Sequence, residues 1–139
     1  MTSTSRPATL TGPTTSQLID RATRDGIRVF WQPPSWHLPA AYAAEASAIW
    51  LRRDLTEAEA RSLLAHEMAH AHYRDRGTQP PPVEARAWRW AARALVTPAA
   101  YAAAEQLVGP AIGALADHLG VTREVVIACQ ADLMRRTHR

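Results

Sequence analysis

Apolar residues recur every three or four positions over most of the chain, which is the spacing of one face of an α-helix. The first such stretch begins at Thr15 and stops near Gly26, and four more follow between residues 83 and 134, after a long one in the middle of the chain. The pattern predicts helices over residues 15–26, 57–73, 83–96, 98–108, 111–119 and 121–134.

Two short stretches are predicted as strands instead, and the first alternates apolar and polar residues as a half-buried strand does. They cover residues 27–31 and 48–52, and Pro33 with Pro34 ends the first. The connection between the two strands is expected to contain Tyr42. The predicted fold class is therefore α+β: a compact, helix-rich domain with a small β-sheet.

The strongest helix signal begins at Thr56, which is followed three residues later by Glu59. These two residues form the pattern of a capping box, in which each side chain bonds the backbone N–H of the other. Thr97 and Thr122 are expected to cap two of the later helices in the simpler way.

The first 14 residues are rich in Ser, Thr and Pro and carry too little apolar surface to offset the entropy lost on ordering. We expect a flexible tail over residues 1–14 and a single domain over 15–139, which is the number of domains that 139 residues favour. The chain contains one cysteine, Cys129, so an intramolecular disulfide and a cysteine-based metal site are excluded.

The net charge is +3, and all 16 basic residues are arginines that form no block. Residues 115–134 have the outline of a helix-turn-helix but few nearby basic residues, so direct nucleic-acid binding is not expected. The N-terminus lacks the apolar core of a signal peptide, and no apolar run has the length of a membrane span. We therefore expect a cytoplasmic protein without membrane contact.

Candidate chemistry lies in the best-signalled helix, where His66, Glu67 and His70 form an H-E-x-x-H motif. His66 and His70 are one helical turn apart on the same face, so both imidazoles can reach one zinc ion. Glu67 lies about 100° around the helix and can act as general base on a water at the site. The alternative is an amphipathic helix whose histidines are solvated or packed in the core.

A catalytic zinc site needs a third protein ligand. The acidic candidates downstream of the motif are Asp75, Glu84, Glu105, Asp117, Glu124 and Asp132. Asp75 lies off the ligand face if the helix continues, whereas Glu84 opens the next helix after a proline-rich reversal and is preferred. The alternative for Glu84 is an acid of the first helical turn that only interacts with the helix dipole.

The segment 55–71, which holds the motif, resembles the active-site helix of the ImmA/IrrE metallopeptidases, and residues 84–96 are similar to the second motif of that family. The resemblance covers roughly residues 27–98. It implies a zincin-like fold, Zn²⁺ bound by His66, His70 and Glu84, and Glu67 as the catalytic base. Family members are typically encoded by mobile elements or prophages and cleave a helix-turn-helix repressor encoded nearby. The sequence departs from the second motif of many members at Arg86 and Trp88, where they carry acidic or Asn residues.

Peptide hydrolysis also needs a group that stabilises the oxyanion. Tyr73 continues the His66–His70 stripe, and Tyr42 lies ahead of the second strand, so either hydroxyl could point at the site. The alternative is that both tyrosines only pack at the edge of the core.

The sequence thus predicts a zinc metallopeptidase that cleaves a protein regulator such as a transcriptional repressor. The rival prediction is a zinc-stabilised binding module that sequesters its partner without cleaving it. A carboxylate beside the ligands favours the enzyme, because a purely structural zinc site has no need of one. A metal hydrolase that acts on other bonds would share the same residues, and the oligomeric state is not predicted.

Overall fold

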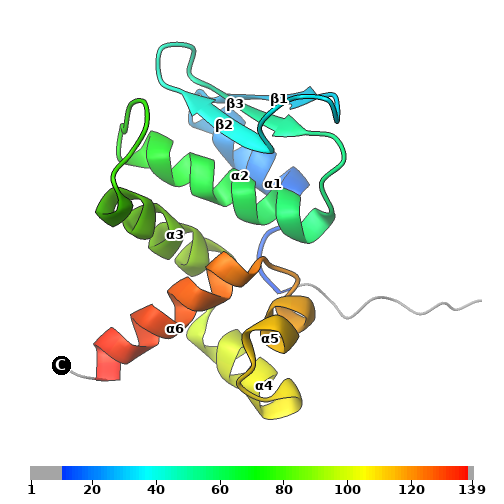
Figure 1. Cartoon of the computed structure of the whole chain (residues 1–139), viewed down its shortest axis with the longest axis vertical. Coiled ribbons are helices and arrows are strands. Elements are labelled where there is room, and N and C mark those ends of the chain that lie inside the picture. The colour runs from blue at the N-terminus through cyan, green and yellow to red at the C-terminus, as the bar shows by residue number, and fades with distance from the viewer. Residues whose placement is uncertain (1–10, 138–139) are drawn as a thin grey trace, which may run out of the picture.

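The computed structural model describes residues 11–137, over which six helices and three strands are found (Figure 1). In chain order the elements are α1 (Thr15–Arg24), β1 (Arg28–Gln32), β2 (Ala40–Ala43), β3 (Ala48–Arg52), α2 (Glu57–His72), α3 (Pro81–Leu95), α4 (Pro98–Val108), α5 (Ile112–Leu119) and α6 (Arg123–Thr137). The predicted α+β class is confirmed. None of the described helices is both long and apolar enough to cross a membrane.

The three strands form one mixed sheet in the order β1-β3-β2. β1 runs parallel to β3, with Val29 opposite Ile49, and β2 runs antiparallel to β3, with Tyr42 opposite Ile49. Tyr42 lies between the two predicted strands as expected, but on a third strand and not in a loop. Three of the four residues of β2 are alanines, which carry little strand propensity, so only pairing with β3 reveals the strand.

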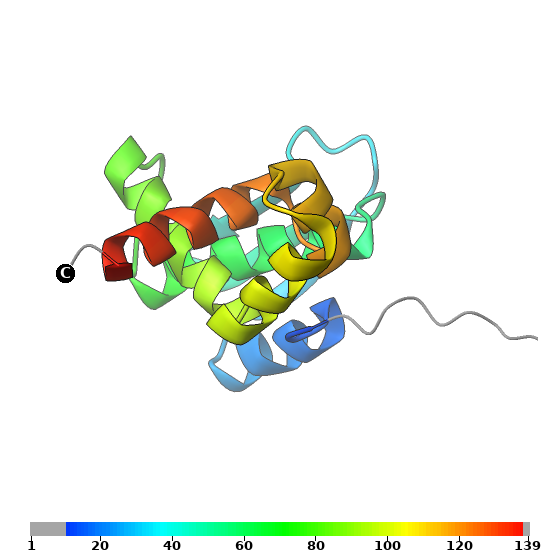
Figure 2. The same cartoon turned by 90° about the horizontal axis from the view of Figure 1, so that it is seen from below.

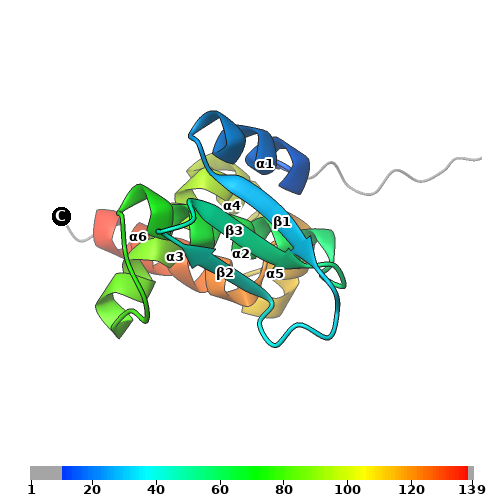
Figure 3. The same cartoon turned by 90° about the horizontal axis from the view of Figure 1, so that it is seen from above.

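The sheet lies on α2, and no described element covers its other face (Figures 1 and 3). Side chains alternate between the two faces of a strand, and the fully buried Ile49 and Leu51 of β3 face the helices. On the opposite face Phe30 and Trp50 stack with their ring centroids 6.0 Å apart.

Helix α1 packs beside α2 and β1, and helices α3 to α6 form a second layer on the side of α2 away from the sheet. α3 packs along α2, α6 packs on α3, and α4 and α5 close the end of this layer (Figure 2). Leu64 of α2, Leu95 of α3 and Val125 of α6 are almost completely buried and belong to one continuous core. α2 is thus enclosed between the sheet and the other helices, which fixes the helix that carries the motif.

A buried arginine fastens the first half of α2 to distant parts of the chain. Arg61 is 0% exposed, and its guanidinium donates hydrogen bonds to four backbone carbonyl oxygens. Those of Leu119 and Gly120, at 2.6 and 2.8 Å, lie at the end of α5, where helix carbonyls lack partners within the helix. The other two belong to Thr11 and Pro13, both at 2.9 Å.

Ordered structure begins before the predicted boundary at residue 15. Thr11 and Pro13 are bonded to Arg61, and Thr14 forms a capping box with Gln17 at the start of α1. Residues 1–10 of the predicted tail lie outside the described residues.

Two of the three predicted caps are present. Thr56 and Glu59 form the expected capping box of α2, and the Thr97 side chain accepts from the backbone N–H of Ala100. The predicted side-chain cap of α6 is wrong, because the hydroxyl of Thr122 has no partner among the described residues. Instead the Thr122 backbone N–H donates to the Ser62 hydroxyl at 3.1 Å, which ties the start of α6 to α2.

Candidate metal centre

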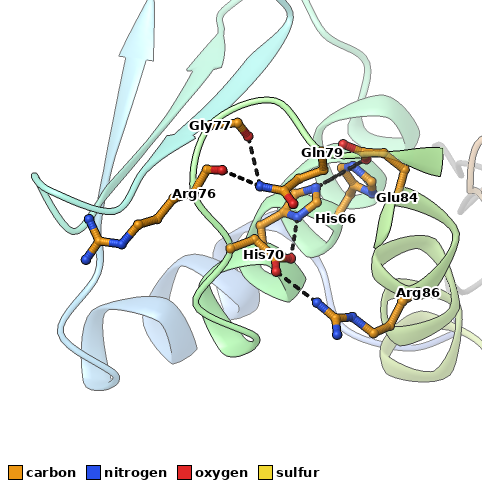
Figure 4. Close-up of polar contacts among 8 residues, drawn as sticks. His66, His70, Arg76, Gly77, Gln79, Glu84 and Arg86 are labelled. Carbon is orange, nitrogen blue, oxygen red and sulfur yellow. Dashed lines mark hydrogen bonds and ion pairs between the residues drawn. The ribbon is translucent and has the colours of Figure 1, made fainter. Parts of the chain in front are cut away.

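Three side chains from two helices converge beside the sheet (Figure 4). His66 and His70 are one turn apart on α2, and their Nε2 atoms lie 3.2 Å from each other. Oε1 of Glu84, in the first turn of α3, lies 2.8 Å from Nε2 of His66 and 3.2 Å from Nε2 of His70. One ligand atom from each residue lies within 4.8 Å of the other two. The structure therefore brings together the three residues expected to bind a metal.

The chain reaches Glu84 through a short loop and a proline run. Gln79 donates from its side-chain amide to the carbonyl oxygens of Arg76 and Gly77, which holds the loop in a tight turn (Figure 4). Pro81 and Pro82 then occupy the first positions of α3, where the missing N–H and the fixed φ favour helix initiation. Glu84 thereby faces α2 from a helix that packs along it.

Burial shifts the pKa of two groups of the motif, His66 and Glu67. Both histidines are less than 10% exposed, and burial lowers the pKa of His66 to about 4, so that its imidazole is neutral at pH 7. The neutral form is the one that donates a lone pair to a metal. Burial also raises the pKa of Glu67 to about 7, which places this carboxylate in the range of an effective general base at neutral pH.

Asp75 orients His70 from the far side of the ring. Its Oδ2 accepts from Nδ1 of His70 at 2.9 Å, and its Oδ1 accepts from Arg86 at 2.8 Å. A carboxylate can only accept, so Nδ1 carries a proton, and the ring is held with Nε2 facing His66 and Glu84. A cation at the meeting point would be shared by all three ligand atoms, so the donor set fits a metal ion.

Asp75 is one of the acidic ligand candidates, expected to lie off the ligand face if the helix continues. The helix instead ends at His72, and Arg74 adopts a left-handed conformation with φ 58°. This turn brings Asp75 back to His70, whose carbonyl also accepts from the Asp75 backbone N–H. The helix end near residue 73 is expected; the feature that the sequence does not reveal is the left-handed turn after it, because Arg74 stands where Gly or Asn usually marks such a turn.

His66 is held differently from His70. Its Nδ1 is buried and has no hydrogen-bond partner among the described residues. The Trp88 indole packs against the ring instead, with centroids 4.0 Å apart and planes 30° apart.

The three side chains and Glu67 line a cavity of about 420 Å³ between α2 and the edge strand β2. Residues 40–42 of β2 form one wall, and residues 77–79 of the α2–α3 loop form another. An exposed ion pair between Arg76 and Glu45, 3.1 Å long, joins this loop to the β2–β3 turn.

A family model described as Peptidase M78, IrrE N-terminal-like domain, matches residues 22–128, which is more than three quarters of the chain. The chain belongs to this family. The resemblance seen in the sequence is thereby confirmed, and the matched segment contains the whole candidate centre of the M78-family domain. No curated protein matches the chain significantly.

The two tyrosines expected near the M78-family centre lie in different places. Tyr42, on β2, lines the cavity. Tyr73 follows the last residue of α2 and is not among the residues that line the cavity; the Arg86 guanidinium lies 3.9 Å from its ring centroid. A role for either hydroxyl in stabilising an oxyanion stays a prediction, and the placement favours Tyr42.

The other acidic candidates do not join the metal-ligand cluster. His66, His70 and Glu84 are the only such cluster found among the described residues. Asp132 bonds Arg93 through both carboxylate oxygens, at 2.6 and 3.2 Å. Glu105, Asp117 and Glu124 are exposed.

We expect Asp75→Asn to lower the zinc affinity of this domain by about 10–100-fold, because the amide no longer fixes the His70 ring as strongly. Competition with a chromogenic chelator measures the affinity. Asp54→Asn, an exposed carboxylate paired with Arg52 away from the centre, is the matched control and should bind zinc as the wild type does. Equal affinity in both variants would show that Asp75 does not orient the ligand.

Proposed function

We propose that this M78-family domain is a zinc-dependent endopeptidase in which His66, His70 and Glu84 bind Zn²⁺. The observation that carries the proposal is the convergence of these three ligand atoms in one cavity with the half-buried carboxylate of Glu67. Two imidazoles and one carboxylate, with an open side toward a cavity, are a ligand set that catalytic zinc sites use.

When bound, zinc would polarise the scissile carbonyl and lower the pKa of a water molecule. The protein's own residues divide the remaining work. The Glu67 carboxylate takes a proton from the attacking water and passes it to the leaving amine, which its pKa of about 7 suits. Asp75 keeps the proton of His70 on Nδ1 so that Nε2 faces the centre. The Tyr42 hydroxyl is our candidate for stabilising the oxyanion.

The position of β2 supports a peptide as the substrate. β2 pairs only with β3, so its second edge is not paired within the described sheet, and its residues 40–42 line the cavity. An extended peptide can add to such an edge through backbone hydrogen bonds, which would bring a peptide bond alongside Glu67. A hydrolase of small molecules has no need of an edge strand at its active site.

We further propose that the substrate is a protein regulator, such as a helix-turn-helix repressor, in the cytoplasm. Membership of the family supports this substrate class, and the single buried cysteine suits a reducing compartment. The alternative is a zinc-stabilised module that sequesters the same partner. It does not explain why the Glu67 carboxylate lies in the cavity beside the ligands.

The first test is the zinc content of the purified wild type and of Glu84→Ala, measured by elemental analysis. We expect about one zinc per chain in the wild type and a loss in Glu84→Ala, because two imidazoles alone bind zinc weakly. Glu105→Ala, an exposed acid on α4, is the matched control and should retain zinc. A normal zinc content in Glu84→Ala would overturn the assignment of Glu84 as the third ligand. If none of the proteins contains zinc after reconstitution, the proposed enzymatic function is wrong.

The second test incubates the zinc-loaded protein with helix-turn-helix repressors from the same genome. Mass spectrometry of the products would show a new N-terminus if the repressor is cleaved. A repressor that binds but stays intact would favour the sequestering module.

A further inference from the structure

A second cavity, of about 590 Å³, adjoins the candidate active site. Tyr42 lines both cavities, so the two lie on either side of one residue of β2. The walls of the second cavity come from the end of α1, the β2–β3 turn, the last turn of α2 and α3. An extended peptide that lies along β2 and enters the first cavity therefore passes the mouth of the second.

Basic groups predominate in this second cavity. Arg21, His72 and Arg74 line it, and Asp25 is the only acid that does. No carboxylate lies within ion-pair distance of Arg21 or Arg74 among residues 11–137. Both guanidinium groups can therefore donate hydrogen bonds to an anionic group of a ligand.

The aromatic ring of Trp90 gives the cavity a firm wall. The Arg21 guanidinium lies 5.6 Å from the centroid of this indole, and the His72 ring lies 5.5 Å from it. Stacking of this kind holds a guanidinium in place by a cation–π interaction and leaves its N–H groups free to donate.

The backbone is strained at two places in the wall of this cavity. Among the described residues, only Ser47 (φ 47°) and Arg74 (φ 58°) adopt positive φ without being glycine, and both line the cavity. The turn after α2 needs a left-handed residue, but Gly adopts that conformation at no steric cost. An arginine there indicates a use for its side chain, since strained residues gather at functional sites.

We propose that this cavity is a specificity subsite that binds an acidic side chain of the substrate, a role that rests on the proposed peptidase function. Arg74 and Arg21 donate hydrogen bonds to the carboxylate of an Asp or Glu a few residues from the scissile bond. The bidentate geometry of a guanidinium suits a carboxylate, and the cavity has room for one side chain without displacing Tyr42.

The test exposes the zinc-loaded protein to a peptide library of randomised sequence and records the residues around each cleaved bond. We expect Asp and Glu to be enriched about tenfold at one fixed position in the wild type, the size of effect that a charge-assisted hydrogen bond gives. Arg74→Gly and Arg21→Gln should each reduce the enrichment severalfold. Arg24→Gln, on α1 but outside the cavity, should keep it.

The Arg74→Gly variant distinguishes a role of Arg74 in substrate binding from a role in stabilising the fold. Glycine relieves the positive φ, so the melting temperature should stay the same or rise while the preference for acids falls. The zinc content of the variant is measured in parallel, because Arg74 precedes Asp75. Cleavage without acid enrichment in the wild type, or enrichment unchanged in both variants, would overturn the subsite and leave the peptidase standing.

If no peptide is cleaved, a binding experiment tests the subsite instead. The same library is passed over immobilised Glu67→Gln protein and over its Glu67→Gln, Arg74→Gly double variant. Acidic peptides retained by the first and lost by the second would support the subsite although the proposed hydrolysis had failed. If peptides are retained without enrichment of Asp and Glu, or if none is retained, both the subsite and the peptidase function are wrong.

Discussion

Glu67→Gln is expected to reduce peptide hydrolysis by about a thousandfold while the zinc content stays at the wild-type level. Gln has nearly the same shape as Glu, but its amide cannot take a proton from water, and general-base catalysis contributes about 10²–10⁴-fold. Glu67 lies outside the cluster of His66, His70 and Glu84, so its loss should leave the metal ligands in place. Initial rates on a cleaved repressor or library peptide, with elemental analysis of the same sample, measure both quantities.

Glu59→Gln is the matched control for this substitution. Glu59 lies on the same helix at the capping box, away from the cavity, and Gln can keep the bond to the backbone N–H of Thr56. Its rate should equal that of the wild type. If Glu67→Gln hydrolyses peptides at the wild-type rate, the assignment of Glu67 as the general base is wrong.

Arg61→Ala is expected to lower the free energy of unfolding by about 3–5 kcal/mol. The substitution empties the space of a fully buried side chain and leaves the carbonyl groups of Leu119 and Gly120 without their donor. For a domain whose total stability is about 5–15 kcal/mol, this loss should lower the melting temperature by about 10 °C or more.

Thermal and urea denaturation monitored by circular dichroism measure this effect. Arg61→Lys should lie between the wild type and Arg61→Ala, because one ammonium keeps the charge but cannot reach all four carbonyls. Arg53→Ala removes an exposed arginine and should change little. A shift below about 1 kcal/mol in Arg61→Ala would show that water replaces the guanidinium at these carbonyls.

Local signals predicted much of the fold. The helix over residues 57–73 is observed as Glu57–His72, and its capping box was readable because both partners lie within one turn. The H-E-x-x-H pattern placed two imidazoles on one face by helical geometry alone. The three prolines ahead of Glu84 indicate a chain reversal, which predicts that its carboxylate faces the histidines.

The features that were missed depend on contacts between distant residues. β2 exists because of its pairing with β3, and its alanines carry no strand signal. The hydrogen bond from His70 to Asp75 depends on a helix stop at an arginine in a left-handed conformation, which sequence rules assign to glycine. Arg61 was not singled out because its four partners are backbone carbonyls, which carry no residue-type pattern.

The partners of Arg61 also bear on the order in which the protein can form during synthesis. A nascent chain that has reached the end of α3 already contains His66, His70 and Glu84, but not Leu119 or Gly120, which lie 58 and 59 residues after Arg61. Until those carbonyls leave the ribosome, burial of α2 would leave a guanidinium short of acceptors. Burial of α2, and with it the assembly of the His66, His70 and Glu84 cluster, is therefore expected to follow the synthesis of α5.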